Sequence, residues 1–224
     1  VSKYTDIIYA LSTPPGKSAI AVIRISGNNC LKLLKKITLI KKITPNKAKL
    51  VLIKFEKKLI DQVIINSFNS PRSFTGQDMF EINCHGNLVI VKKISEILEK
   101  LGARLAEPGE FTKRALMNNK LDLVQTESLS DLINSETEKQ RSMAMSNLSG
   151  GLSDFTKKLN TELHLLLANT EALIDFSDEE LPKNTFIRIK EQNKNIINKI
   201  EKELRNSHIS KPIRDGFVVS VVGK

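Results

Sequence analysis

Short apolar runs rich in β-branched residues dominate the first hundred residues of the chain. Five of these runs have the length and composition of strands: residues 6–12, 18–26, 49–55, 59–68 and 78–84. Residues 28–37 and 88–101 instead repeat apolar side chains at helical spacing, and Gly102 marks the end of the second segment. Because strands and helices alternate irregularly, with few strand-helix-strand units, the pattern predicts an α+β sheet domain.

The pattern changes after about residue 109, where the strand signal stops. Three amphipathic stripes at helical spacing lie in residues 121–133, 152–173 and 189–204. Gly150-Gly151 is expected to break a helix or to let two helices pack closely, and Pro212 is expected to end the bundle. The valine-rich residues 216–222 return to a strand pattern. A helical domain therefore follows the sheet domain.

Length and charge narrow the class of protein. At 224 residues the chain is long enough for two domains, and 40% apolar residues suffice for buried cores. The 35 Lys and Arg residues outnumber the 25 Asp and Glu residues, which gives a formal charge of +10 and favours an anionic partner such as nucleic acid. The excess is spread along the chain, however, so a lysine-rich compositional bias explains it equally well.

Cysteine content and hydropathy indicate where the protein works. Cys30 and Cys84 show no CxxC spacing and no Cys/His cluster, so neither a disulfide framework nor a zinc site is expected. The first ten residues lack the features of a signal peptide, and no apolar run reaches the ~20 residues needed to span a bilayer. We expect a soluble, cytoplasmic protein with no membrane partner.

Two charged residues interrupt the strand patterns of the sheet domain. Arg24 is either an edge residue with its head in water or a ligand for carboxylate or phosphate. Glu81 is either part of a solvated strand face or an acceptor for the N–H groups of a heterocycle. Cys84 and His85 are adjacent on one strand and point to opposite faces, which argues against a nucleophile-base pair.

Other polar residues lie on or beside the predicted helices. Glu110, Lys113 and Arg114 fit a solvated helix face, whereas Lys120 follows an Asn-rich turn from which it can reach a ligand on the sheet domain. The acidic residues within 171–180 do not have calcium-loop spacing. Helix capping or a domain hinge is the favoured interpretation of that stretch, and metal binding is the alternative.

Five stretches of the chain occur in the same order as in one protein family. They read TPPGKSAIAVIRISG, PRSFTGQDMFEINCHGN, RLAEPGEFTKRALMNNKLDLVQTESLSDLI, LSGGLS and EALIDFSDEE. Together they resemble the family of tRNA-modifying GTPases known as MnmE or TrmE, over a span from about Thr5 to Lys224. Each stretch alone is a moderate signal, and five in order are a specific one.

The resemblance implies a domain order. Residues 1–118 would form an α+β domain that binds a tetrahydrofolate derivative and makes the homodimer, similar to the folate-binding domain of the glycine-cleavage T-protein. Residues 119–212 would form the first part of a helical domain. Residues 213–224, which end in VVGK, would begin a Ras-like GTPase domain whose phosphate-binding loop is expected to continue beyond Lys224.

The resemblance also implies an activity. The family works with the flavoprotein MnmG, as a heterotetramer, to place an aminomethyl or carboxymethylaminomethyl group on C5 of the wobble uridine of tRNA. The one-carbon donor would be 5-formyl- or 5,10-methylenetetrahydrofolate, and GTP with Mg²⁺ and K⁺ would bind in the GTPase domain. By position, the family's folate-contacting residues match Arg24, Glu81 and Lys120, and no catalytic residue or metal site is expected within this chain.

Two other functions account for parts of the sequence. A folate-dependent aminomethyltransferase of the T-protein type would share the sheet domain, but not the stretches NKLDLVQTESLSDLI and IDFSDEE. A basic RNA-binding module would need only the charge, and it would leave Arg24, Glu81 and Lys120 without roles.

Overall fold

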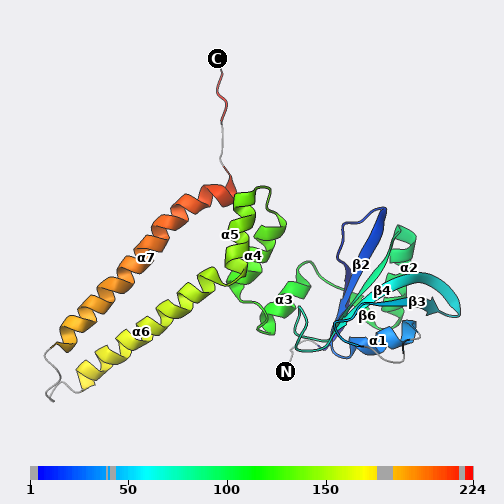
Figure 1. Ribbon diagram of the computed structural model, residues 1–224, viewed down its shortest axis with the longest axis horizontal. Helices are drawn as coiled ribbons and strands as arrows, with labels where there is room; N and C mark the ends of the chain where they lie inside the picture. The colour runs from blue at the N-terminus through cyan, green and yellow to red at the C-terminus, as the bar shows by residue number, and fades with distance from the viewer. Residues whose placement is uncertain (1–4, 39, 41–43, 176–183, 217–219, 224) are drawn as a thin grey trace. The chain divides into compact units, whose positions relative to one another are not determined.

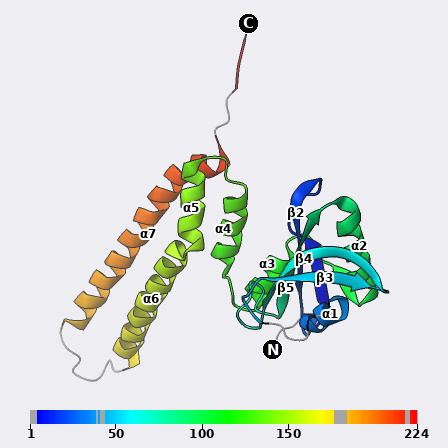
Figure 2. The ribbon, with the colours of Figure 1, turned by 45° about the vertical axis from the view of Figure 1, so that its right-hand side comes forward.

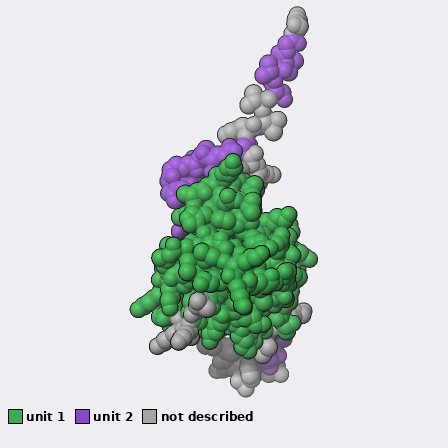
Figure 3. Space-filling view, turned by 90° about the vertical axis from the view of Figure 1, so that its right-hand side faces the viewer, with its two compact units in different colours: residues 1–122 green, residues 123–224 purple. Residues whose placement is uncertain are grey.

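The computed structural model divides into two compact units, residues 1–122 and residues 123–224, which are coloured separately in Figure 3. It describes residues 5–38, 40, 44–175, 184–216 and 220–223. The division falls a few residues after the domain boundary that the sequence predicts between residues 118 and 119. Each unit is described by itself below.

The first unit is built on a six-stranded sheet with the order β3-β4-β5-β2-β1-β6. The strands are β1 (Ile7–Leu11), β2 (Ser18–Ser26), β3 (Lys49–Phe55), β4 (Lys58–Phe68), β5 (Met79–Gly86) and β6 (Ala103–Leu105). All neighbours are antiparallel except β1 and β6, which run parallel. The five predicted strands and the α+β class are confirmed, whereas the short strand β6 has no counterpart among the predictions.

The two faces of the sheet differ in character. Helices α1 (Cys30–Ile37) and α2 (Leu88–Lys100) cover one face, where Ile23, Phe80 and Ile82 are fully buried (Figure 1). Burying such a side chain stabilises the fold by roughly 1.5–3 kcal/mol. Side chains of opposite parity along the same strands point to the other face, which we call the open face. It carries Arg24 and Glu81.

Helix α3 (Glu110–Met117) is fixed by an ion network that the sequence analysis did not anticipate. Arg114 is fully buried, and its Nη2 lies 2.8 Å from both Glu110 Oε1 and Asp6 Oδ1. Arg104 in β6 donates to both oxygens of Glu110 and to Asp6. The predicted solvated helix face is therefore wrong for Glu110 and Arg114, although Lys113 is exposed as predicted. A buried guanidinium needs such partners because an unpaired buried charge is costly.

The network also shifts the acidity of its carboxyl groups. The hydrogen bonds from Arg104 outweigh the effect of burial and lower the pKa of Glu110 to about 2. Partial burial alone would raise the pKa of Asp6, but the charges of Arg114 and Arg104 hold it below its usual value. Both carboxylates are therefore ionised at neutral pH.

The second unit is helical (Figures 1 and 2). Its helices are α4 (Leu123–Ile133), α5 (Glu138–Leu148), α6 (Gly151–Asp175) and α7 (Thr185–Asp215). Gly150, at φ 102°, separates α5 from α6, as one of the two predicted roles of the glycine pair requires. None of the helices in the described ranges combines the length and apolar composition that a bilayer crossing demands.

Two predictions near the C-terminal end have different outcomes. Helix α7 continues through Pro212 to Asp215, so the prediction that this proline ends the helix is wrong. Pro212 lies within the last turn, where loss of one N–H donor costs less than in a helix centre. Of the strand predicted at 216–222, residues 217–219 lie outside the described residues, and residues 216 and 220–222 are not in a strand.

We predict that Glu110→Gln destabilises the first unit by about 3–5 kcal/mol, because it leaves the buried Arg114 and its partners short of one negative charge. Denaturant unfolding followed by circular dichroism measures the change. Glu138→Gln is the matched control, since Glu138 and Arg141 form an exposed pair one turn apart on α5 and little change is expected there.

The same variant should alter the acid sensitivity of the fold. The pKa of Glu110 is lowered from 4.5 to about 2, so its stabilising charge is fully present above pH 4.5 and is lost as the pH falls toward 2. The wild-type protein should lose stability over that range more steeply than Glu110→Gln. Parallel losses in the two proteins would contradict the role given to Glu110.

Candidate functional site

Arg24 and Glu81 form a cross-strand ion pair on the open face. They lie directly opposite each other in the β2–β5 register. Glu81 Oε1 accepts hydrogen bonds from Arg24 Nε at 2.9 Å and from Nη2 at 2.8 Å. The side chains are 30% and 17% exposed, so the pair is half-buried yet reachable from solvent. Within the described part of the chain no hydrogen bond reaches Glu81 Oε2, which leaves that oxygen as a positioned acceptor.

Two aromatic rings flank the guanidinium of Arg24. Its Cζ atom lies 5.5 Å from the ring centre of Phe74 and 5.9 Å from that of Phe111. Both distances lie within the range of cation–π attraction. Phe74 belongs to the β4–β5 connection (residues 69–78), and Phe111 belongs to α3, so three separate segments meet at Arg24. Neither phenylalanine is among the residues that the sequence analysis singled out.

The β4–β5 connection is anchored to the rest of the unit on both sides. Ser26 Oγ and Thr75 Oγ1 lie 2.6 Å apart in a buried hydrogen bond, and Asn118 Nδ2 donates to the Thr75 carbonyl at 2.7 Å. Gly76 has a φ of +76°, and a Cβ atom there would lie 3.1 Å from Lys120 Cγ. The aliphatic part of Lys120 therefore lies against Gly76, where only glycine leaves room for it.

The structure relates the three predicted site residues unequally. Arg24 and Glu81 are in direct contact, whereas Lys120 reaches the site through the β4–β5 connection that carries Phe74. Lys120 is exposed. Within the described residues it forms no ion pair with Glu81, whose partner is Arg24. The pairing of Arg24 with Glu81 was not predicted, because a sequence does not give the register of two strands 57 residues apart.

This arrangement suits recognition of a flat, polar ligand. A carboxylate oxygen accepts from amino and ring N–H groups, the two phenylalanine rings offer apolar faces, and the Arg24 and Lys120 cations attract anionic groups. The site contains no nucleophile beside a base, so its chemistry is binding and orientation rather than bond cleavage by a side chain.

A second polar pair lies at the far end of β5. His85 Nδ1 is 2.7 Å from Asp61 Oδ1, and the backbone N–H of His85 donates to Asp61 Oδ2 at 2.9 Å. The sequence analysis used Asp61 only as part of a strand. Its signal was a carboxylate inside the apolar run LIDQVII, a position that is seldom polar unless it has a partner.

Cys84 does not take part in this pair. It is buried in the core, and burial together with the charge of Asp61 raises the pKa of its thiol to about 11. His85, in contrast, is 67% exposed on the opposite face. The prediction that Cys84 and His85 are poorly placed for nucleophilic catalysis is therefore confirmed.

The metal-binding alternative for the acidic stretch stays a prediction. Asp178, Glu179 and Glu180 lie outside the described residues, and α6 ends at Asp175. In the ranges that the structure does describe, no three His, Cys, Asp or Glu side chains gather closely enough to bind a metal ion.

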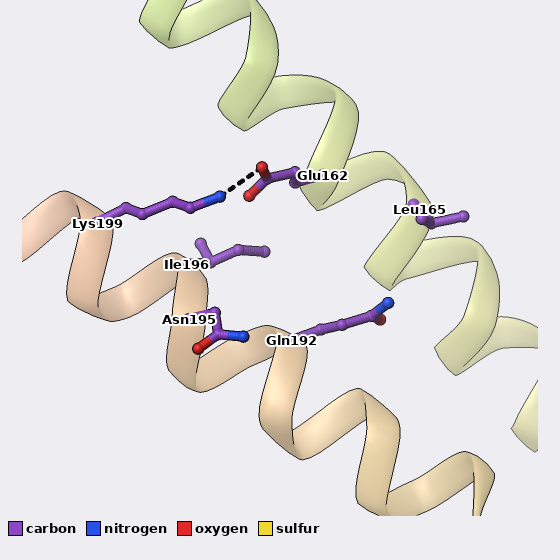
Figure 4. A pocket seen from close by; sticks show the side chains of 6 residues that line it. All are labelled: Glu162, Leu165, Gln192, Asn195, Ile196 and Lys199. Carbon is purple, nitrogen blue, oxygen red and sulfur yellow. Dashed lines mark hydrogen bonds and ion pairs between the residues drawn. The ribbon is translucent and has the colours of Figure 1, made fainter.

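A shallow pocket of about 210 Å³ lies between α6 and α7 (Figure 4). It is lined by Glu162, Leu165, Gln192, Asn195, Ile196 and Lys199. An ion pair between Glu162 and Lys199 crosses one end of it. The lining lacks convergent titratable groups, so we regard this pocket as a packing feature of the helix pair rather than as the functional site.

Comparison with known proteins gives matches over nearly the whole chain. The family model "GTP-binding protein TrmE N-terminus" matches residues 7–120, and "MnmE helical domain" matches residues 123–218. Relatives named "tRNA modification GTPase MnmE" are similar along their aligned length. Those from Ruegeria sp. (strain TM1040), Thermotoga petrophila and Neorickettsia sennetsu are 39%, 40% and 42% identical over 222, 226 and 218 residues.

These alignments cover the two proteins of each pair differently. They include 97%, 98% and 97% of this chain, but 51%, 48% and 40% of the three relatives. The chain therefore spans about half the length of the curated relatives that it matches.

We predict that neither cysteine reacts with a thiol reagent such as Ellman's reagent at about pH 8 in the folded protein. Cys30 and Cys84 are buried, and burial raises the pKa of both thiols, so little reactive thiolate is present. Both should react after denaturation. A Ser142→Cys variant, exposed on α5, is the control that should react at once. Rapid modification of native Cys84 would restore it as a candidate nucleophile.

Proposed function

Because the chain belongs to the MnmE family of tRNA modification GTPases, we propose that it works in tRNA modification and that its first unit binds a reduced folate. The ligand would be 5-formyl- or 5,10-methylenetetrahydrofolate. The single observation that carries this proposal is the Arg24–Glu81 pair on the open face, flanked by Phe74 and Phe111.

The chemistry of that pair supports a pterin-like ligand. Arg24 holds one oxygen of Glu81, so the second oxygen faces the site with its orientation already restricted. A pterin presents an amino group and a ring N–H side by side, and a charged acceptor binds such donors strongly. Lys120 would meet an anionic or carbonyl group further along the ligand, since its ammonium lies beyond the Gly76 turn. The chain would supply binding and orientation, and the folate would supply the one-carbon unit.

We also propose that the first unit forms the homodimer. Ile20, Leu50 and Ile64 on the open face are 59%, 62% and 43% exposed, and apolar side chains gathered on one side of a sheet are typical of an interaction surface. Ile64 lies opposite Leu50 in the β3–β4 register, so these two are neighbours on that face.

The remaining parts of the proposal concern the whole protein. A Ras-like GTPase domain that binds GTP with Mg²⁺ and K⁺, a flavoprotein partner of the MnmG type, and modification of C5 of the tRNA wobble uridine in the cytoplasm follow from family membership. The formal charge of +10 is consistent with contact with tRNA. The match of residues 123–218 to the MnmE helical domain argues against an aminomethyltransferase of the T-protein type.

We predict that Arg24→Ala, Glu81→Gln and Lys120→Ala each weaken binding of 5-formyltetrahydrofolate by about 10-fold or more, because each removes a hydrogen bond or contact to a charged group. Isothermal titration calorimetry measures the affinities. Arg24 and Glu81 are bonded to each other, so the double variant should lose less affinity than the sum of the two single losses.

Three variants of the same residue types serve as controls. Arg141→Ala, Glu96→Gln and Lys113→Ala change exposed side chains away from the pair and should bind the folate as the wild type does. A tRNA anticodon stem is titrated in parallel. Folate binding that is lost in Arg24→Ala while RNA binding persists supports the proposal. A wild-type chain that binds RNA but no folate would leave the basic RNA-binding module as the better account.

A further inference from the structure

The Asp61–His85 pair has the geometry of an oriented acid-base group. Asp61 is buried, with 7% of its side chain exposed, and its carboxylate accepts three hydrogen bonds. Gln62 N–H donates to Oδ1 at 2.8 Å, and the backbone N–H and the ring Nδ1 of His85 supply the other two. Three donors stabilise the charged carboxylate in its buried position.

The orientation of the imidazole follows from this carboxylate. An ionised Asp61 accepts only, so Nδ1 must carry a proton in both the neutral and the charged form of His85. The ring is thereby held at one edge while its side chain remains 67% exposed. Nε2 then faces solvent as a proton donor in the charged form and as an acceptor in the neutral form. A carboxylate that fixes the tautomer of a histidine is the arrangement used in acid-base catalysis.

Two other roles for the pair fit less well. A metal site would need a third ligand, and none is present within the described residues. Activation of Cys84 is excluded by geometry, because that thiol is buried on the opposite face. The exposed histidine therefore has no partner on its outer edge among the features described above, and it is available to a ligand.

His85 lies on the same face of the same strand as Glu81. Residues 81, 83 and 85 alternate with the buried residues 80, 82 and 84. Four residues at about 3.3 Å each place the two Cα atoms roughly 13 Å apart along β5. An extended ligand whose amino end meets Glu81 and which follows β5 therefore runs toward the imidazole.

We propose that His85, held by Asp61 as a positioning residue, is the proton donor of the folate site. This inference rests on the proposed folate binding. With the pyrimidine end of the ligand at Glu81, the nitrogens that bear the one-carbon unit lie toward His85. The charged imidazole donates its Nε2 hydrogen to an acceptor there and delivers that proton when the acceptor needs it. The Nε2–H bond breaks, its electron pair stays on the imidazole, and His85 becomes neutral while Nδ1–H remains bonded to Asp61.

The test measures protons and tautomers rather than turnover. Calorimetric titrations with 5-formyltetrahydrofolate at about pH 7, in two buffers with different ionisation enthalpies, give the number of protons taken up on binding. An imidazolium that donates to the ligand gains affinity for its proton, so the wild type should take up a fraction of a proton. The uptake should vanish in His85→Gln and persist in His164→Gln, which changes another exposed histidine, on α6.

A ¹⁵N NMR spectrum of the imidazoles gives a second readout. In the free protein the neutral form of His85 should show protonated Nδ1, and added 5-formyltetrahydrofolate should shift its Nε2 signal. Asp61→Asn should mix the two tautomers, whereas a merely structural loss would leave the tautomer of the remaining folded protein unchanged. His85→Gln replaces an exposed side chain, so it retains the fold even if Asp61→Asn does not.

The outcomes separate the two proposals. A wild-type chain that does not bind 5-formyltetrahydrofolate overturns the folate site, and the His85 assignment with it. Folate binding with equal proton uptake in the wild type and His85→Gln, or with no change at Nε2, overturns the His85 assignment alone.

Discussion

The buried ion network around Arg114 is the interaction on which the site depends. Arg114 is inaccessible to solvent, and its charge is tolerated because Glu110 and Asp6 lie within 2.8 Å of its Nη2. Asp6 precedes β1, Arg104 lies in β6, and Glu110 begins α3, so the network joins the sheet edge to the helix. Position and orientation of α3 follow from it. Phe111 on α3 then reaches Arg24, and the chain after α3 brings Lys120 to Gly76.

The sheet divides its labour between its two faces. One face buries alternate apolar side chains under α1 and α2 and supplies most of the stability of the first unit. The other face is free of helices and displays polar groups on a rigid support: the Arg24–Glu81 pair at its middle and the Asp61–His85 pair at the end of β5. In both pairs one carboxylate fixes its partner's geometry before any ligand arrives, which reduces the cost of ordering the site on binding.

Periodicity and composition predicted the elements of the fold well, because strands and helices impose periods on their own residues. Interactions between elements were a different matter. Glu110 and Arg114 are spaced four residues apart, which on an exposed helix indicates a solvated pair, and only the surrounding sheet edge makes the pair buried. Similarly, the partnership of Arg24 with Glu81 follows from strand register, and that of His85 with Asp61 from the end of a ladder. The three-residue strand β6 is too short to carry a period.

The central claim is that a reduced folate binds on the open face beside Arg24 and Glu81. Its most direct test is a ¹H–¹⁵N correlation spectrum of the assigned chain titrated with 5-formyltetrahydrofolate. The account predicts saturable shifts of the amides of Arg24, Phe74, Gly76, Glu81 and Lys120, with α6 and α7 unaffected. Shifts confined to the face covered by α1 and α2 or to residues 123–224, or no shifts at ligand concentrations that saturate other folate proteins, would contradict it.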